Sequence, residues 1–238
     1  MARSSETGNA VNLGKFASTV SIVESLGDSF DPAHEIIKKD ALQSFYQECQ
    51  NAHKKATDTQ VAYDRAVNTR KALFQPLKKI GTRILNAYIA AGAPTADVED
   101  LRGVNRKLQG DNVRAAKDPG SDEEGKRAYS AAQQGFVNLV DHLSVMTARC
   151  AGLPGYAPAD ADIEVSALQQ LAQQLKTANT AVDTAAHAWR TAREERSRLF
   201  YDEDRGMVAR SQLLRSYFKS KKEGGDPLKG IQFRTFRK

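Results

Sequence analysis

The residue types that most often do chemistry occur here without the spacing that a catalytic or metal centre needs. A di-iron site in a helical bundle requires Glu-x-x-His pairs on facing helices, and no glutamate of this chain has a histidine three positions later. Glycine-rich phosphate loops, a Gly-x-Ser-x-Gly elbow and an HExxH motif are also missing. We expect the four histidines to face solvent or cap helices: His34, His53, His142 and His187. The sequence therefore predicts a protein that is not an enzyme, with no catalytic residue, no metal and no cofactor.

The cysteine content and the start of the chain point to a cytoplasmic protein. Two cysteines, Cys49 and Cys150, cannot build a disulfide framework, which favours a reducing compartment. Cys49 falls in an apolar stripe, and we expect it to be a small buried hydrophobic residue. Residues 1–13 lack the apolar stretch of a signal peptide, and no apolar run approaches the roughly 18 residues of a spanning helix. We therefore expect no membrane contact.

Basic residues gather at the ends of two segments. Residues 205–238 hold ten basic residues and two acidic ones, a net charge of +8, whereas the whole chain carries +6. The candidate contacts to a partner or to nucleic acid are Lys219, Lys221, Lys222, Arg234, Arg237 and Lys238 in this tail and Arg102, Arg106 and Lys107 upstream. Aromatic residues between the tail cations are compatible with phosphate contacts and base stacking. A solvated or protein-contacting face explains the same composition.

Two arginines occupy positions where apolar side chains are otherwise the rule. Arg70 and Arg196 lie at matching points of two long apolar stripes. Burying an unpaired charge is very costly. We therefore interpret both as structural charges that pair with a carboxylate of another helix or extend their stems toward solvent.

The elements that must position these residues occur twice. Ala41-Leu42-Gln43 recurs as Ala167-Leu168-Gln169, an offset of 126. The same offset pairs Phe30 with Tyr156, Pro32 with Pro158, Ile37 with Ile163 and Phe74 with Phe200, and an offset of 127 pairs residues 101–104 with 228–231. We interpret this as a tandem duplication, 12–108 and 126–238, with a linker at 109–125 and a flexible N-terminus at 1–11. Neither copy could bury its stripe alone, so we expect 12–238 to form one domain.

Each copy is predicted to contain one helix of about 40 residues. Small or apolar residues follow steps of three and four from Leu42 to Leu73 and from Leu168 to Leu199. No glycine or proline interrupts 33–75 or 159–205. Shorter apolar stripes precede and follow each long one. The predicted fold is all-α: an elongated bundle in which the two long helices form a coiled-coil-like central pair and shorter helices flank them.

Several short motifs add a resemblance. They are Phe30-Asp31-Pro32, Tyr156-Ala157-Pro158, Pro76-Leu77-Lys78-Lys79, Asn105-Arg106-Lys107-Leu108-Gln109-Gly110 and Leu228-Lys229-Gly230-Ile231-Gln232-Phe233. With them the chain resembles a family of uncharacterised, tandem-duplicated helical proteins found mainly in Bacteroidota bacteria. The resemblance covers nearly the whole chain and departs from the family at 111–125 and at 224–227. It implies a bacterial helical bundle and carries over no functional residue.

Three functional hypotheses remain open at this point. The first is a non-catalytic interaction or scaffold protein that binds an unknown protein partner or itself. The second is a nucleic-acid-binding protein that uses the basic groups at the repeat ends. The third is a self-assembling structural subunit.

Overall fold

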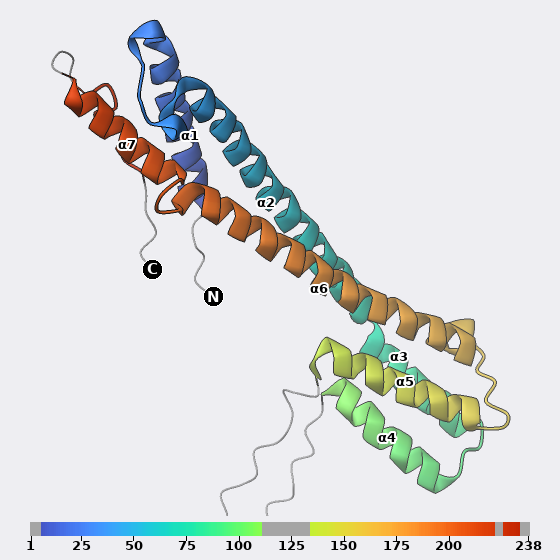
Figure 1. The fold of residues 1–238 in the computed structure, drawn as a ribbon. Coiled ribbons are helices and arrows are strands. Elements are labelled where there is room, and N and C mark those ends of the chain that lie inside the picture. The colour runs from blue at the N-terminus through green and yellow to red at the C-terminus, as the bar shows by residue number, and fades with distance from the viewer. Residues whose placement is uncertain (1–5, 111–133, 222–225, 234–238) are drawn as a thin grey trace, which may run out of the picture. The chain divides into compact units, whose positions relative to one another are not determined.

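A computed structural model describes residues 6–110, 134–221 and 226–233, and these residues form helices joined by turns, with no strand. The prediction of an all-α fold is confirmed. The elements are α1 (Glu6–Ser25), η1 (Gly27–Ser29), η2 (Glu35–Ile37), α2 (Lys39–Phe74), α3 (Leu77–Ala90), α4 (Thr95–Gln109), α5 (Phe136–Gly152), η4 (Ala161–Ile163), α6 (Val165–Tyr201) and α7 (Met207–Ser220), where η marks a 3-10 helix (Figure 1). The chain divides into two compact units, unit 1 at 1–63 with 185–238 and unit 2 at 64–184.

Unit 1 contains α1, α7, most of α2 and the last part of α6. Its core places Phe16 edge-on against Phe45, with ring centroids 5.8 Å apart, and surrounds the fully buried Leu42 and Phe200. The two long helices are tied here by an ion pair between Lys55 and Glu195 at 2.7 Å and by the stacked rings of Tyr63 and Trp189 at 5.2 Å.

A buried polar contact fixes α1 against α6 in the same unit. The Tyr201 hydroxyl donates to Asn9 Oδ1 at 2.9 Å and accepts from Asn12 Nδ2 at 3.1 Å. Asn12 is fully buried and Asn9 nearly so. Buried polar groups must be paired, so this contact specifies which turn of α1 faces Tyr201.

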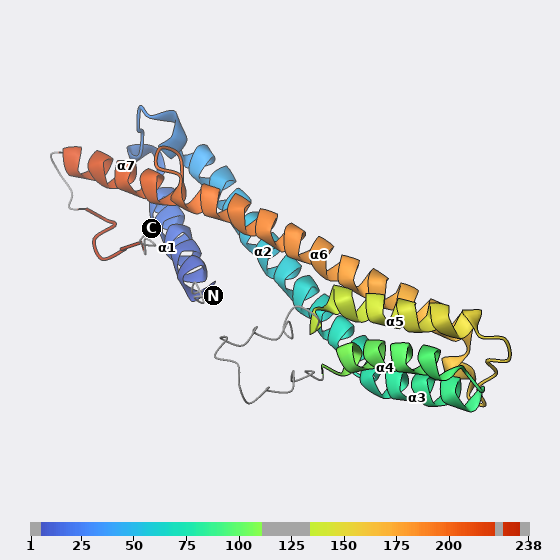
Figure 2. The same cartoon turned by 90° about the horizontal axis from the view of Figure 1, so that it is seen from below.

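Unit 2 contains the end of α2, the start of α6 and the helices α3, α4 and α5, which lie side by side in both views (Figures 1 and 2). Its buried core includes Leu77, Ile84, Leu101, Leu143 and Leu168. Gly81 permits the close approach of α3 to α4. A Cβ at this position would lie 2.8 Å from Asn105 Oδ1 and 2.9 Å from Leu108 Cδ2, closer than real Cβ contacts allow.

Local sequence signals set the boundaries of these helices. Each long helix is preceded by a 3-10 turn, η2 or η4, so α2 and α6 begin several residues after Pro32 and Pro158, with 36 and 37 residues. Pro76 is the N-cap of α3, where its missing N–H costs nothing. Gly110 ends α4 in the left-handed conformation, with φ of 80°, which only glycine adopts without strain.

Several predicted boundaries differ from the observed ones. Helix α1 begins at Glu6, so residues 6–11 are helical rather than a flexible N-terminus, because Asn9 is held by Tyr201. The predicted linker starts with Gln109, the last residue of α4, and its part 111–125 lies outside the described residues. Residues 101–104 are helical in α4, whereas the matching 228–231 lie in a turn region. Each compact unit takes residues from both predicted copies.

Within the described parts of the chain, no helix is both long enough and apolar enough to cross a lipid bilayer.

Candidate functional site

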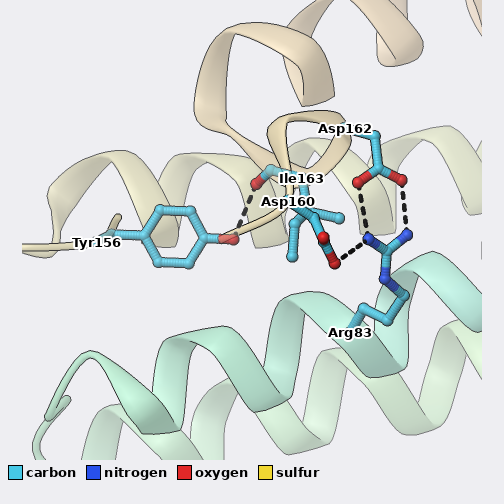
Figure 3. A network of polar contacts seen from close by, with 5 residues as sticks. All are labelled: Arg83, Tyr156, Asp160, Asp162 and Ile163. Atoms are coloured by element: carbon cyan, nitrogen blue, oxygen red, sulfur yellow. Dashed lines mark hydrogen bonds and ion pairs between the residues drawn. The ribbon is translucent and has the colours of Figure 1, made fainter. Parts of the chain in front are cut away.

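One corner of unit 2 joins α3 to η4 through an arginine and two aspartates (Figure 3). Arg83 grips Asp162 with both Nη atoms, at 2.6 and 2.7 Å, and its Nη2 also donates to Asp160 Oδ2 at 2.8 Å. A planar guanidinium binds a carboxylate well in this bidentate geometry. We call this set, together with Tyr156 and Ile163, the α3 corner.

The opposite side of the η4 turn is pinned by a tyrosine. The Tyr156 hydroxyl donates to the carbonyl oxygen of Ile163 at 3.0 Å (Figure 3), and burial raises the pKa of this hydroxyl. The Ile163 side chain is only 4% exposed and belongs to the core of unit 2. The segment between α5 and α6 is therefore held by an apolar anchor, a hydroxyl and an ion pair.

A hollow of about 530 Å³ lies beside the α3 corner. Its lining includes Arg83, Asn86, Ala90, Gly155, Pro158 and Asp160. The hydrogen bonds that Arg83 donates lower the pKa of Asp162, and the acceptance of these bonds by Asp162 and Asp160 raises the pKa of Arg83. Both groups thus stay ionised at neutral pH and are paired with each other, an arrangement suited to holding a turn rather than to transferring a proton.

Unit 1 has a corresponding corner between α7 and η2, built from different partners. The Arg210 guanidinium donates to the carbonyl of Ile36 and to that of Arg205, and it lies 3.9 Å above the ring of Phe45. Burial lowers the pKa of Arg210. We call Ile36, Phe45, Arg205 and Arg210 the α7 corner.

A second hollow, of about 600 Å³, adjoins the α7 corner. Its lining includes His34, Ile36, Glu203, Arg205, Gln212 and Ser216. Beside it, Asp202 caps the turn after α6, since its carboxylate accepts from the N–H groups of Asp204 at 3.1 Å and Arg205 at 2.8 Å. These main-chain hydrogen bonds lower the pKa of Asp202.

The two thiols are removed from reactivity. Cys49 is fully buried, and burial raises the pKa of its thiol to about 12. Burial also raises the pKa of the Cys150 thiol. The thiolate is the nucleophilic form, so neither cysteine supplies a nucleophile at neutral pH. Among the described residues, no group of three His, Cys, Asp or Glu side chains is placed to hold a metal ion.

The basic residues predicted to contact a partner have different environments. Arg102 pairs with Glu99 one turn away, and the Lys221 ammonium donates to the Ser29 carbonyl at 2.6 Å while lying 4.9 Å from the Tyr217 ring. Arg106, Lys107 and Lys219 are exposed. Lys222, Arg234, Arg237 and Lys238 lie outside the described residues.

The two arginines of the long stripes are placed differently from each other. Arg70 lies 4.0 Å from the centre of the Phe136 ring, so an aromatic face contacts its charge. Arg196 is only 5% exposed. Its positive charge opposes the rise that burial causes in the pKa of the neighbouring Tyr201 hydroxyl.

Sequence reasoning missed the ion pair of the α3 corner. The available signal was weak: Arg83 lies in a stretch without acidic residues, and Asp160 and Asp162 stand in an Asp-x-Asp pattern just before a long helix. Arg83 and Asp160 are 77 positions apart in the sequence, so no local pattern shows that they are close in space.

Comparison with protein-family models, with curated proteins and with solved structures gives no match to this chain.

Proposed function

We propose that this chain is a non-catalytic helical interaction or scaffold protein of the cytoplasm. The observation that carries the proposal is how its charged groups are used at the two corners. Arg83 with its aspartates, and Arg210 with its carbonyls and ring, bind segments of their own chain. These charged side chains thus stabilise the fold. The exposed faces of the helices are left to contact a partner.

We also propose that the chain arose by tandem duplication and that its two copies form one pseudo-twofold bundle. In its support, η2 and η4 have bounds 126 residues apart, and so do the first residues of α2 and α6. Leu42 and Leu168, a matched pair, are both fully buried. The family resemblance and the bacterial origin that it implies are further parts of this proposal.

The experiment is a reconstitution of the native complex. The protein is cross-linked gently in its own cells, the cross-linked partner is purified separately, and its binding is measured by titration calorimetry. Charge reversal on an exposed face, Arg106→Glu with Lys107→Glu, should weaken binding at least tenfold. The paired variants Cys49→Ala and Tyr156→Phe should bind normally, because both groups are buried or engaged within the fold.

Two results would decide against the proposal. One is a purified partner that shows no direct binding. The other is turnover of a small molecule that Tyr156→Phe or Asp162→Asn abolishes while the melting curve is unchanged. Light scattering on the same sample distinguishes a foreign partner from a second copy of the chain, the outcome that would favour a self-assembling structural subunit.

A further inference from the structure

One end of unit 2 gathers five exposed basic side chains from three helices. Lys71 is in the last turn of α2, Lys78 and Lys79 are in the first turn of α3, and Arg106 and Lys107 are in the last turn of α4. We call this surface the basic end.

Main-chain contacts hold these helix ends together. Lys78 Nζ donates to the Gln109 carbonyl at 2.7 Å, and Gln109 Nε2 donates to the Lys78 carbonyl at 2.7 Å. Lys107 is tied to the start of α5, because Gln134 Nε2 donates to its carbonyl at 2.6 Å. The end of α2, the start of α3, the end of α4 and the start of α5 lie together in both views (Figures 1 and 2).

The end of α2 is joined to the same place by aromatic packing. Phe74, three residues after Lys71, lies edge-on to Phe136 with ring centroids 4.8 Å apart. The positions of the five cations are therefore set by packed helices rather than by a loose tail.

Among the described residues, the helix segments that form the basic end carry an excess of basic side chains. From Arg65 to Ala96 the chain contains six basic residues and no acidic one, and residues 101–110 contain three basic residues and no acidic one. Within the described chain, none of the five cations forms an ion pair with a carboxylate. Two of them, Lys78 and Lys79, stand at the positive end of the α3 dipole, where basic side chains are unfavourable. A surface of this kind attracts anions.

The other end of unit 2 balances its charges internally. Arg83 binds Asp160 and Asp162, and Arg149 binds Asp100 at 3.0 Å. These carboxylates are already occupied by arginines. These three carboxylates offer little free negative charge to the basic end of a second copy, which favours a different polyanion as the partner.

We propose that the basic end is a docking surface for the phosphate backbone of a nucleic-acid duplex. This proposal rests on the interaction function proposed above and specifies the class of the partner. Among the described residues of this end, Val137 in the first turn of α5 is the one large hydrophobic side chain that is largely exposed, and a single side chain is far less than the apolar centre of a protein interface. Interfaces with a duplex are polar and strongly positive, as this surface is. The contacts read no base, so binding is independent of sequence.

The test measures binding of the full chain to a fluorescent DNA duplex of about 20 base pairs at several salt concentrations. Five neutralised phosphates predict a slope of about −4.5 for log K against log salt, and an affinity loss of about 500-fold between roughly 50 and 200 mM salt. The triple variant Lys79→Gln, Arg106→Gln, Lys107→Gln should lower affinity at least tenfold and reduce the slope to about −2.

The matched control removes the same number of charges elsewhere. Arg190→Gln, Arg198→Gln and Lys229→Gln replace three exposed cations of unit 1, and they should keep the slope near its original value. Unchanged helical circular dichroism in both triple variants excludes unfolding. The proposal is overturned if the control loses as much affinity as the test variant, or if the test variant binds like the wild type.

Three further arms separate this proposal from its rivals. A duplex of RNA should bind with a similar salt slope. Tighter binding to single-stranded RNA, or to vesicles of phosphatidylserine and phosphatidylcholine, would overturn the duplex assignment. No duplex binding at low salt would do the same, while a protein partner captured by cross-linking would leave the interaction function standing.

Discussion

The α3 corner and the α7 corner solve one structural problem with different chemistry. In each, a 3-10 turn that precedes a long helix is fastened to the shorter helix that packs beside it. Arg83 of the α3 corner uses two carboxylates that are 59% and 66% exposed. Arg210 of the α7 corner uses main-chain carbonyls and an aromatic face, and it is itself partly buried.

The difference between the two corners shows that the buried isoleucine of each 3-10 turn, and not its polar contact, is the shared feature. Ile37 of η2 and Ile163 of η4 are both nearly buried, at 3% and 4% exposure, and each belongs to the core of its unit. A turn anchored by a buried apolar side chain needs only some polar fastening on its outer side. Equivalent backbones can therefore be held by an ion pair in one unit and by a carbonyl acceptor in the other.

The largest expected effect comes from emptying equivalent core positions. Leu42→Ala in unit 1 and Leu168→Ala in unit 2 each leave a cavity at a fully buried site. Each should lower the free energy of unfolding by about 2–5 kcal/mol, measured by urea denaturation. Val61→Ala, at a side chain that is 44% exposed, should stay within about 0.5 kcal/mol of the wild type. A loss below about 1 kcal/mol at either leucine would break the equivalence of the two cores.

Overpacking the small residues of the long helices should have the next largest effect. Ala52 on α2 is 5% exposed and Ala178 on α6 is 8% exposed. Replacing either with leucine adds volume to a closed layer and should cost about 1–3 kcal/mol, read from a circular dichroism melt. Asn51→Leu, at the exposed position next to Ala52, is the control and should be nearly neutral. If Ala52→Leu or Ala178→Leu melts with the wild type, the space beside that alanine is open.

Periodicity predicted the long helices because their cores are built from local repeats. The stripes that begin at Leu42 and Leu168 follow helical spacing, and the residues on them that the structure buries include Cys49, Ala56, Leu175 and Val182. The short flanking helices followed from the same signal. Helix α4 was not predicted, although its buried residues Val98, Leu101 and Leu108 follow helical spacing. The matched segment at 228–231 lies in a turn region instead of a helix.

The polar contacts could not be predicted, because they join residues that are far apart in sequence. Arg83 finds Asp162 79 positions away, and Arg210 finds the carbonyl of Ile36 174 positions away. Arg70 was expected to pair with a carboxylate or to extend its stem toward solvent, and its guanidinium lies 4.0 Å from the centre of the Phe136 ring. No helical period encodes such pairings, which depend on how the helices pack.

A smaller effect distinguishes the two arginines directly. Arg210→Met keeps the apolar stem but removes the donor to Ile36 and the cation above Phe45, and should cost about 1–2 kcal/mol. Arg83→Met removes an exposed ion pair and should cost less, since such pairs are screened by solvent. Urea denaturation in low salt and in ~1 M NaCl should show a salt-dependent loss for Arg83→Met only. Equal and salt-independent losses would show that both corners depend on apolar contacts of the stem.

The smallest expected effect is a local opening of the α3 corner in acid. Arg83 holds the pKa of Asp162 below its ordinary value, so this aspartate stabilises the fold at every pH above its unfolded pKa of about 3.9. That stabilisation is lost as the pH falls through the lower pKa of the folded state.

The amide of Ile163, bonded to the Asp160 carbonyl at 3.2 Å, should lose hydrogen-exchange protection below about pH 4. The amide of Ile37 in η2, bonded to the His34 carbonyl at 3.2 Å, is the internal reference, because Arg210 holds η2 through a main-chain carbonyl. Asp162→Asn should give the low-pH behaviour of Ile163 at neutral pH, and equal loss of protection at both amides would show that acid opens the two corners by a common route.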